Sequence, residues 1–258
     1  KGDAPPEKFA FRAAAWREAR LEVHDLREVR RQSEADFVRA LAEARDGRLS
    51  AGSLKLFESR VRAYDPDAAP EPVRVFTHNR QVDEMNERRL AALPGVMVAI
   101  RAQEYGHEAL LARIDRDCLS PRVLGLKCGA RVMFTRNDQA GRFCNGTLGT
   151  VTEIAEGGFL RDGREQVVVE KDDGCEVHLK DRAAWEIKEG ERVVASRKQL
   201  PLKLAWAATV HKTQGMTIDR ISVDLSRVFE HGQGYVAVSR ARALAGLNIE
   251  AWRGAATF

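Results

Sequence analysis

The sequence has no phosphate-binding P-loop. The pattern GxxxxGK[ST] occurs nowhere in its 258 residues, so the usual cradle for a nucleoside triphosphate and its magnesium ion is missing. The pair Asp83-Glu84 falls inside a predicted helix, whereas a magnesium-holding carboxylate pair follows an apolar strand. No Ser/His/Asp signature and no paired-carboxylate motif stands out either. These absences exclude a self-contained triphosphate site.

Cysteine is scarce and irregularly placed. The four cysteines form no CxxC pair, and the six histidines do not complete a zinc pattern. We therefore expect free thiols in a reducing cytoplasm and no metal site. No apolar run is long enough to span a bilayer, and the first residues lack the layout of a signal peptide. We expect a cytoplasmic protein, associated with a bacterial-type nucleoid, that has no membrane segment.

Charge of one sign is not in large excess. The formal net charge is +4, although 31% of the residues are charged. This mild basicity fits a nucleic-acid partner without requiring one.

The first part of the chain follows the pattern of an α/β domain. Periodic apolar positions predict helices over residues 34–47 and 50–61, after a short helix and a strand within residues 11–26. The next predicted elements are a strand at 73–76, a helix at 80–93 and a strand at 96–100. A strand, a polar turn, a helix and another strand are typical of a parallel sheet.

The pattern changes near residue 124. Short β segments alternate with the turn signals Asn-Gly, Glu-Gly-Gly, Arg-Asp-Gly and Asp-Asp-Gly, and no helix of useful length fits between Gly125 and Lys198. We predict that residues 124–198 form a small antiparallel β-barrel of Src-homology-3 size. The barrel would be inserted into a discontinuous α/β domain made of residues 1–123 and 199–258.

After the predicted insertion, the α/β pattern returns. Residues 201–214 predict a helix with Pro201 in its first turn, and residues 220–225 predict a strand. A second helix is expected over residues 232–244 and a last strand over 246–252.

Arginines supply the first candidate chemistry. Arg30, Arg31 and Gln32 lie between a predicted strand and a helix, and Arg240 and Arg242 lie in the second late helix. A guanidinium group is always charged and forks onto phosphate oxygens, so an arginine facing a bound nucleotide stabilises a transferring phosphoryl group. A solvated helix face explains most arginines equally well, but least well Arg240, whose neighbours are small and apolar.

The stretch WAATVHKTQGMTIDR, residues 206–220, is the second candidate. His211, Lys212 and Thr213 can hold a nucleic-acid backbone by charge and hydrogen bonds. Gln214 can orient a water or bind a phosphate oxygen, and Gly215 lets backbone approach a ligand closely. The same residues also fit an ordinary helix C-terminus, and their spacing alone leaves both interpretations open.

The third candidate is the cluster Thr77, His78 and Asn79, directly after the predicted strand at 73–76. Ligands of open α/β sheets bind beyond the carboxyl ends of the strands. Thr77 or Asn79 would equally serve as the N-cap of the following helix, and the two roles are compatible.

Taken together, these motifs resemble the petite-integration-frequency (Pif) DNA helicases, a RecD-related 5′-to-3′ branch of helicase superfamily one. The resemblance covers nearly the whole chain and rests on five stretches in family order. They are VRRQSEADFVRALAEARDG, VFTHNRQVDEMNERRL, LGLKCGARVMFTRN with FCNGTLGTV, PLKLAWAATVHKTQGMTID, and GQGYVAVSRARALAGL. The chain resembles the C-terminal half of these helicases, which is a second RecA-like motor domain with an inserted barrel.

The resemblance implies roles for the matching residues. Arg31 and Arg240 would be arginine fingers on the γ-phosphate of ATP, with Gln32 beside them. Gln214 and Gly215 would lie near the same phosphate, and Thr217 near the ribose. The backbone of single-stranded DNA would be contacted by Thr77, His78, Asn79, His211, Lys212 and Thr213. His78 departs from the family pattern, which has Thr at that position.

The resemblance also implies partners. ATP and Mg²⁺ would be held mainly by a first RecA-like domain N-terminal to this chain, which supplies the missing P-loop. We therefore expect a fragment of a longer, monomeric helicase that translocates on single-stranded DNA and unwinds duplex or forked DNA in repair and recombination. The fragment alone would not hydrolyse ATP. The sequence leaves open the physiological substrate, whether forks, G-quadruplexes, R-loops or telomeric ends.

Two alternatives stay open. A RecD-like or relaxase-type helicase half shares the motor motifs, although the lead into the barrel favours the Pif branch. A non-enzymatic adaptor would bind single-stranded nucleic acid without needing Arg31 or Arg240. A P-loop encoded upstream of Lys1 would decide for a motor.

Overall fold

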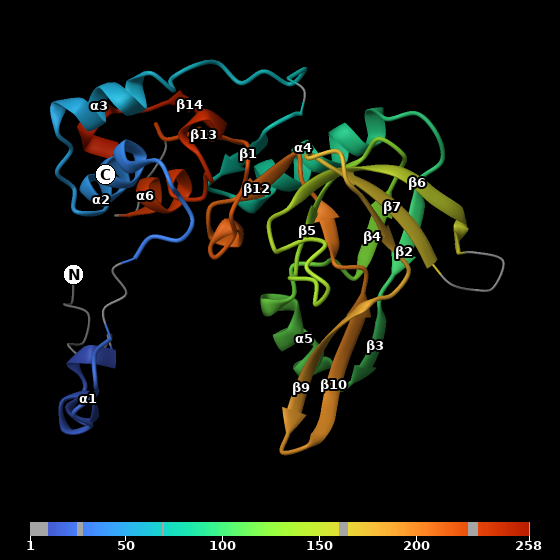
Figure 1. The fold of residues 1–258 in the computed structure, drawn as a ribbon. Coiled ribbons are helices and arrows are strands. Elements are labelled where there is room, and N and C mark those ends of the chain that lie inside the picture. The colour runs from blue at the N-terminus through green and yellow to red at the C-terminus, as the bar shows by residue number, and fades with distance from the viewer. Residues whose placement is uncertain (1–9, 25–27, 69, 160–164, 227–231, 258) are drawn as a thin grey trace. The chain divides into compact units, whose positions relative to one another are not determined.

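A computed structural model describes residues 10–24, 28–68, 70–159, 165–226 and 232–257 (Figure 1). The chain divides into two compact units, residues 1–30 and 31–258. The first unit contains a 3₁₀ turn, η1 (Ala10–Arg12), and a short helix, α1 (Ala14–Glu18). Residues 19–24 form no strand, so the strand predicted there is wrong for the described part; residues 25–27 lie outside the described residues.

The second unit is built on a four-stranded parallel sheet. Its order is β12-β1-β13-β14, and its strands are β1 (Val73–Phe76), β12 (Ala207–Thr209), β13 (Ile221–Asp224) and β14 (Leu247–Ala251). The helices that accompany it are α2 (Ala35–Arg45), α3 (Ala51–Glu58), α4 (Asn79–Ala92) and α6 (Gln233–Val238). The α/β class is therefore confirmed.

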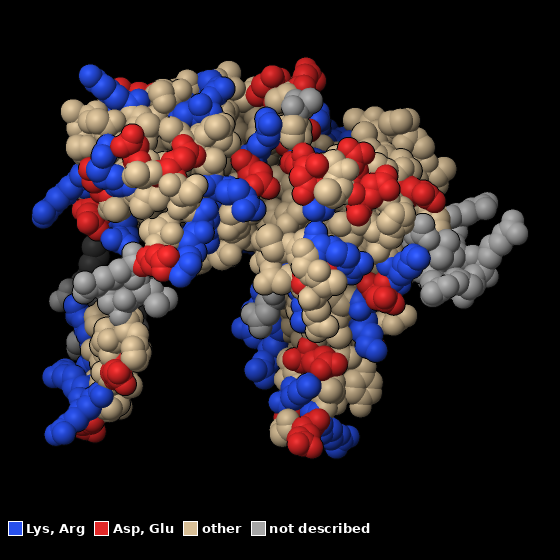
Figure 2. All heavy atoms as spheres, in the orientation of Figure 1, with Lys and Arg blue, Asp and Glu red and all other residues tan. Residues whose placement is uncertain are grey.

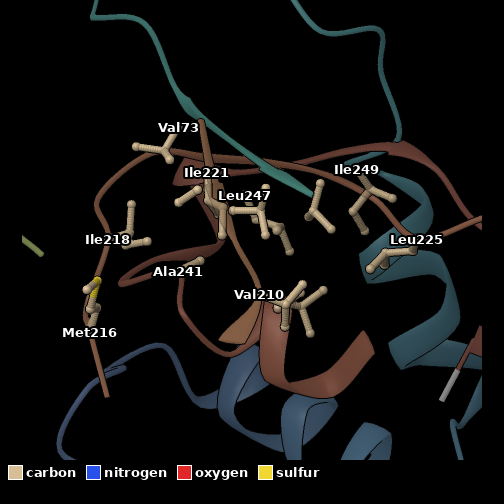
Figure 3. Packing of buried hydrophobic residues seen from close by; sticks show 14 of the residues in the cluster. Val73, Val210, Met216, Ile218, Ile221, Leu225, Ala241, Leu247 and Ile249 are labelled. Atoms are coloured by element: carbon tan, nitrogen blue, oxygen red, sulfur yellow. The ribbon is translucent and has the colours of Figure 1, made fainter. Parts of the chain in front are cut away.

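The core of this sheet is aliphatic. Figure 3 shows Val73, Ile221, Leu247 and Ile249 from the strands packed together with side chains from the loops. The amphipathic helix α2 adds buried residues at the spacing that the sequence predicted. They are Phe37, Ala40, Leu41 and Ala44.

Antiparallel strands occupy the middle of the chain. A five-stranded sheet has the order β11-β5-β6-β7-β8, a three-stranded sheet β3-β10-β9, and a two-stranded ribbon pairs β2 with β4. The bounds are β2 (Val98–Arg101), β3 (Gln103–Gly106), α5 (Glu108–Asp117), β4 (Val123–Leu126), β5 (Arg131–Phe134), β6 (Leu148–Phe159), β7 (Glu165–Lys171), β8 (Glu176–Leu179), β9 (Ala183–Glu189), β10 (Arg192–Gln199) and β11 (Leu202–Leu204).

This region extends beyond the predicted insertion, since β2, β3 and α5 precede residue 124 and β11 follows residue 198. The exact domain bounds, 1–123 with 199–258 and 124–198, and the Src-homology-3 comparison stay predictions. The Arg-Asp-Gly turn at 161–163 lies outside the described residues.

Three predicted elements are wrong in type, partner or length. Residues 201–214 form β11, β12 and a 3₁₀ turn, η2 (His211–Thr213), instead of a helix. A wholly buried apolar run has no periodicity that separates strand from helix, and pairing with β1 decides for strand. The strand at 96–100 exists as β2 but pairs antiparallel with β4, outside the parallel sheet. The helix predicted over 232–244 ends at Val238, so Arg240 and Arg242 lie in the segment that follows α6.

The free edge of the parallel sheet is covered by a side chain of α4. Asn86 Nδ2 donates to the carbonyl of Ala207 at 3.1 Å, and the Ala207 amide donates to Asn86 Oδ1 at 3.0 Å. These are the groups of Ala207 that point away from β1, because the neighbouring Trp206 carbonyl bonds Arg74 of that strand. One buried Asn therefore satisfies both edge groups of β12.

Candidate functional site

Two arginines that are far apart in the sequence meet at one serine. Arg31 Nε donates to Thr217 Oγ1 at 3.0 Å, and its Nη1 donates to the carbonyl of Ser239 at 3.2 Å. Arg240 Nη2 donates to Ser239 Oγ at 2.8 Å, while its Nε donates to the carbonyl of Val236 at 2.9 Å. The structure thus brings together Arg31, Arg240 and Thr217, three residues for which the sequence predicted nucleotide contacts.

Gln32 holds this cluster in place. Its Nε2 donates to the carbonyls of Ser239 and Ala241 at 3.0 and 2.7 Å, and its side chain is buried. The segment after α6 is therefore pinned to the segment that carries Arg31. These bonds make Gln32 a positioning residue for both guanidinium groups, in addition to the nucleotide contact that the sequence predicted.

Among the described residues, no acid pairs with the positive charge of this cluster. Arg240 is 8% exposed. Burial, with the charge of Arg31 as a second cause, lowers the pKa of Arg240 to about 10. Within the described part of the chain, neither arginine forms an ion pair with a carboxylate. A buried cation without a counter-ion costs free energy, so this site favours an anion.

Arg242 is the contrasting case. It lies two residues further along and pairs through its Nε with Asp219 at 2.5 Å, and about half of its side chain is exposed. The sequence placed Arg240 and Arg242 in one helix, and the structure separates them into a buried arginine without a carboxylate partner among the described residues and an exposed, paired one.

Backbone pairing presents Thr217 to the cluster. The Ile218 amide donates to the carbonyl of Arg240 at 2.9 Å, and the Arg242 amide donates to the carbonyl of Ile218 at 3.0 Å. Met216 and Ile218 are fully buried on either side of Thr217 (Figure 3). Because alternate residues of extended backbone point in opposite directions, Thr217 faces away from the core that holds its two neighbours.

The turn before this segment separates exposed groups from buried ones. His211 and Lys212 in η2 are exposed, and Gln214 and Gly215 after it are exposed as well. Thr213 is fully buried, and its hydroxyl donates to the carbonyl of Val210 at 2.7 Å, so its side chain holds the turn. Gly215 has a φ of +82°, which explains why a glycine ends this turn. Among the described residues, no hydrogen bond joins the Gln214 side chain to the arginine cluster.

The other predicted contact cluster lies beside this turn. Phe76 and Thr209 are partners in the register of β1 and β12, and the Val210 amide donates to the carbonyl of Phe76 at 3.0 Å. The residues that follow the two strands therefore leave the sheet at the same carboxyl edge. His78 and Asn79 are exposed there, as are His211 and Lys212. This is the edge at which open α/β sheets bind ligands.

The predicted helix cap is wrong. The N-cap position of α4 is His78, without a side-chain cap, and Asn79 is already the first helical residue. The hydroxyl of Thr77 lies 2.7 Å from His78 Nδ1 and does not reach the helix amides.

Sequence reasoning missed Lys203. This half-buried residue of β11 lines a cavity of about 340 Å³ together with Lys212 and with Asp83 and Glu87 of α4. Burial, and secondly the charge of Lys212, lowers the pKa of Lys203 from 10.5 to about 8. The only signal in the sequence was a lysine inside an apolar run. Ser239, the residue on which both arginines meet, carried no signal of its own.

On the face that Figure 2 shows, acidic and basic side chains are interspersed. The face in that view shows no single large field of one sign. In the part of the chain that the structure describes, no group of three or more His, Cys, Asp or Glu side chains is placed to hold a metal ion. The four cysteines are free; Cys118 is buried. No described helix is long and apolar enough to cross a membrane.

Comparison with known proteins points to one family. The family described as "DNA helicase Pif1, 2B domain" matches residues 109–154. "ATP-dependent DNA helicase PIF1" of Danio rerio is 37% identical over 244 residues, which cover 93% of this chain and 37% of that protein. The chain therefore spans well under half the length of this relative.

Solved structures agree with the sequence matches. The crystal structure of Bacteroides sp Pif1 in complex with ADP-AlF4 superposes with a TM-score of 0.79 at 28% identity, over 95% of this chain and 55% of that one. The Bacteroides Pif1 helicase in complex with ADP-AlF3 and ssDNA superposes with a TM-score of 0.59 at 27% identity, over 97% of this chain and 57% of that one.

Proposed function

We propose that this chain, which belongs to the Pif1 helicase family, is the nucleotide-responding half of an ATP-dependent 5′-to-3′ DNA helicase. In this proposal it is the second, C-terminal motor domain, and a P-loop domain elsewhere in the same polypeptide binds ATP and Mg²⁺. The described residues offer no carboxylate cluster for Mg²⁺, so they fit the part that contacts the phosphates and not the part that holds the metal.

The pair of guanidinium groups at Ser239 carries the proposal. Arg31 and Arg240 converge on one residue, repel each other and lack carboxylate partners among the described residues. A terminal phosphate that enters between them from the P-loop domain would relieve that repulsion. Arg242, two residues further along the chain, does have its own acid, Asp219.

The proposed catalytic roles follow from these contacts. In phosphoryl transfer, negative charge spreads over the equatorial oxygens of the transferred group, and an arginine finger stabilises that charge. Arg31 and Arg240 act as the fingers, and Thr217 with Gln32 aims them. Gln214, exposed after η2, is placed to orient the attacking water, and Gly215 leaves space for the phosphate beside the backbone.

The proposed DNA contacts lie at the carboxyl edge of β1 and β12. His78 and Asn79 on one side, and His211 and Lys212 on the other, offer charge and hydrogen-bond donors to a single-strand backbone. Thr77 and Thr213 shape the two turns. These contacts go to phosphates, so binding is sequence-tolerant and weakens with salt.

Residues 211–217 connect the two ligands. When the fingers close on a phosphate, Thr217 moves with Arg31, and η2 ends only four residues before Thr217. Closing and opening therefore hold the DNA backbone at different positions, which advances the motor along one strand.

Substitution of the buried finger tests the proposal. In the complete helicase, we expect Arg240→Ala to lower kcat for ATP by about 10³–10⁵-fold with little change in nucleotide affinity. Arg242→Ala removes the same charge two residues away and is the matched control; its kcat should stay near that of the wild type. Normal turnover in Arg240→Ala would sink the finger assignment.

A further inference from the structure

A small pocket lies at the amino edge of the parallel sheet, opposite the carboxyl edge that carries the proposed DNA contacts. It is a cavity of about 190 Å³. Residues directly before three strands line it, because β1, β13 and β14 begin level with one another: Val73 pairs with Ile221, and Ile221 with Leu247 (Figure 3). The charged residues of its wall are Arg60, Arg62, Asp65 and Arg220. None of these residues has a role in the proposed function.

Backbone pairing brings the first two arginines to the pocket. The segment after α3 runs beside β14, where the Arg62 amide donates to the carbonyl of Ile249 and the Ile249 amide donates to the carbonyl of Arg60, both at 2.9 Å. Between the two arginines, Val61 forms a parallel bridge with Ile249. Because alternate residues of extended backbone point the same way, Arg60 and Arg62 lie on one side of this segment.

Arg60 is held in place without losing its charge. Its Nε donates to the carbonyl of Leu247 at 2.8 Å, and its Nη2 donates to the carbonyl of Ala245 at 2.6 Å. Carbonyl groups orient a guanidinium group but do not cancel its charge. Burial, and secondly the charge of Arg62, lowers the pKa of Arg60, while Glu34, the third and smallest cause, acts in the opposite direction. Burial beside a second cation favours an anion at this position.

The other two arginines of the wall are exposed. Among the described residues, neither Arg62 nor Arg220 forms an ion pair with a carboxylate. Asp219, which precedes Arg220 in the chain, is paired with Arg242 instead. The lining residues include one acid, Asp65, so three guanidinium groups stand against one carboxylate and their formal charge is +2. The wall of the pocket therefore carries excess positive charge.

The size and the lining of the pocket restrict its ligand. Its volume of about 190 Å³ is below the roughly 300–1,000 Å³ of pockets that enclose a whole drug-sized molecule, so it admits one anionic group and not a complete nucleotide. The uncharged part of the wall consists mainly of small residues and prolines, and none of the lining residues is aromatic. A nucleic-acid base would therefore find no ring on which to stack.

The charge of the wall selects among anionic groups. A phosphate monoester carries about −1.5 to −2 at neutral pH, whereas a phosphodiester and a carboxylate each carry a single negative charge. Guanidinium groups bind phosphate oxygens through pairs of parallel hydrogen bonds. Three guanidinium groups against one carboxylate therefore match a dianion better than a monoanion.

We propose that this pocket binds the phosphate group of a phosphate monoester, which is either a free small molecule or a phosphorylated side chain. Arg60 forms the fixed wall of the site, and Arg62 and Arg220 close on the phosphate from its exposed side. The site needs neither the nucleotide nor the DNA of the proposed function. A phosphate held there joins the segment after α3 to the start of β13, so it stabilises the folded chain.

The test is isothermal titration calorimetry of the 258-residue chain, which has no P-loop to compete for phosphate. The probe is glycerol 2-phosphate at constant ionic strength. The test variant is Arg62→Gln with Arg220→Gln, and the matched control is Arg48→Gln with Arg113→Gln, two exposed arginines outside the pocket. We expect the test variant to bind about tenfold or more weakly, because it loses two sets of charge-assisted hydrogen bonds. The control should match the wild type, and Arg220→Gln alone should show an intermediate loss.

Comparison ligands test the charge and the source of the phosphate. Dimethyl phosphate and acetate, each with a single negative charge, should bind the wild type at least about tenfold more weakly than glycerol 2-phosphate. Equal binding of dimethyl phosphate would show a site for any anion and overturn the monoester assignment. A phosphoserine peptide flanked by alanines decides the source. Tighter binding of this peptide than of glycerol 2-phosphate identifies a phosphorylated protein, and equal binding identifies a free ligand; both results support the phosphate site.

One further variant separates this pocket from the arginine cluster. If Arg62→Gln with Arg220→Gln binds glycerol 2-phosphate as tightly as the control does, the pocket proposal is wrong. If Arg31→Gln abolishes binding in that case, the phosphate lies at the arginine cluster and the result supports the proposed function. A wild-type chain that binds no glycerol 2-phosphate overturns the pocket proposal alone, since the proposed function is tested by ATP turnover of Arg240→Ala in the complete helicase.

Discussion

Gly146 lies where the antiparallel region touches the arginine cluster. Its φ is +97°, and a Cβ added there would lie 2.7 Å from the carbonyl oxygen of Thr217 and 3.2 Å from its amide nitrogen. Thr217 is also the residue whose hydroxyl accepts from Arg31. The Asn-Gly turn before β6 is therefore in direct contact with the residue that we propose to position Arg31.

Gly146→Ala perturbs this contact in two ways. The left-handed backbone costs an alanine about 1–2 kcal/mol. The added methyl also forces Thr217 to retreat by roughly 0.7 Å or more to regain ordinary contact, and such overpacking costs about 1–3 kcal/mol. We expect the free energy of unfolding to fall by about 2–5 kcal/mol in total. A shift of this size at a catalytic group is also expected to lower kcat by about ten- to hundred-fold.

Two other glycines supply controls. Gly141, in the same loop, has a φ of +72° and open space around it, so Gly141→Ala isolates the backbone cost. Gly149 has ordinary backbone but a Cβ there would lie 2.6 Å from the Glu170 carbonyl oxygen, so Gly149→Ala overpacks β6 and β7 without touching Thr217. Urea unfolding followed by tryptophan fluorescence measures the free energy of unfolding. ATP turnover of the complete helicase measures whether Thr217 still positions Arg31 for the proposed reaction. Equal turnover in Gly146→Ala and Gly149→Ala, at matched folded fraction, would refute the reasoning.

Two further predictions concern stability. Lys203 has a lowered pKa of about 8 against 10.5 when unfolded, so between these values the unfolded chain binds more protons and stability rises with pH. Lys203→Met should remove that rise and stabilise the protein by about 1–2 kcal/mol at pH 7, measured by urea unfolding across pH 6–11. Asn86→Ala should cost at least about 1–3 kcal/mol because it leaves both edge groups of Ala207 without partners, while Glu87→Ala, at an exposed neighbour, should change stability by less than about 0.5 kcal/mol. If the difference in unfolding free energy between the wild type and Lys203→Met does not change with pH, the argument about the Lys203 pKa is wrong. If Asn86→Ala and Glu87→Ala lose equal stability, the argument about the edge groups of Ala207 is wrong.

Local sequence pattern was enough to predict a helix or strand where only one face of that element is buried. The helices α2, α3 and α4 and the strands β1, β13 and β14 lie where periodicity and turn residues predicted them. In α2 the buried positions match the apolar spacing residue for residue. Amphipathic periodicity records burial on one side, and it survives in the sequence whatever the partner is.

Local sequence pattern did not predict the structure correctly where both faces of an element are buried. It also failed where the type or pairing of an element depends on a partner strand that is distant in the sequence. Residues 204–208 are all apolar, and alanines favour a helix locally, yet β12 forms because β1 offers a hydrogen-bonding edge more than a hundred residues earlier in the chain. The strand at 98–101 was recognisable, but nothing in its own residues shows that it pairs with β4. Pairing is a long-range property that local propensity does not record.

The candidate site shows the same limit. Arg31 and Arg240 are 209 positions apart, and no spacing rule brings them to one serine. Resemblance to a family supplied the two residues, but not Ser239, not the amide of Gln32 that pins the two segments, and not the seat of Gly146 against Thr217. These contacts depend on how β13, α6 and the β5–β6 loop meet, and the sequence of each segment is silent about the others.

Residues 209–217 connect the end of an edge strand, an exposed basic turn and the residue that contacts Arg31. Thr209 ends an edge strand, η2 exposes His211 and Lys212, and Thr217 holds Arg31. Thr213 and Met216 lie between Thr209 and Thr217 and are fully buried, as is Ile218 directly after Thr217. In the proposed function we therefore expect a displacement of Thr217 to move the turn as well as Arg31. A loop with exposed residues throughout would absorb such a displacement. In the proposed function, burial at positions 213, 216 and 218 is what would couple a phosphate at one end of this segment to DNA at the other.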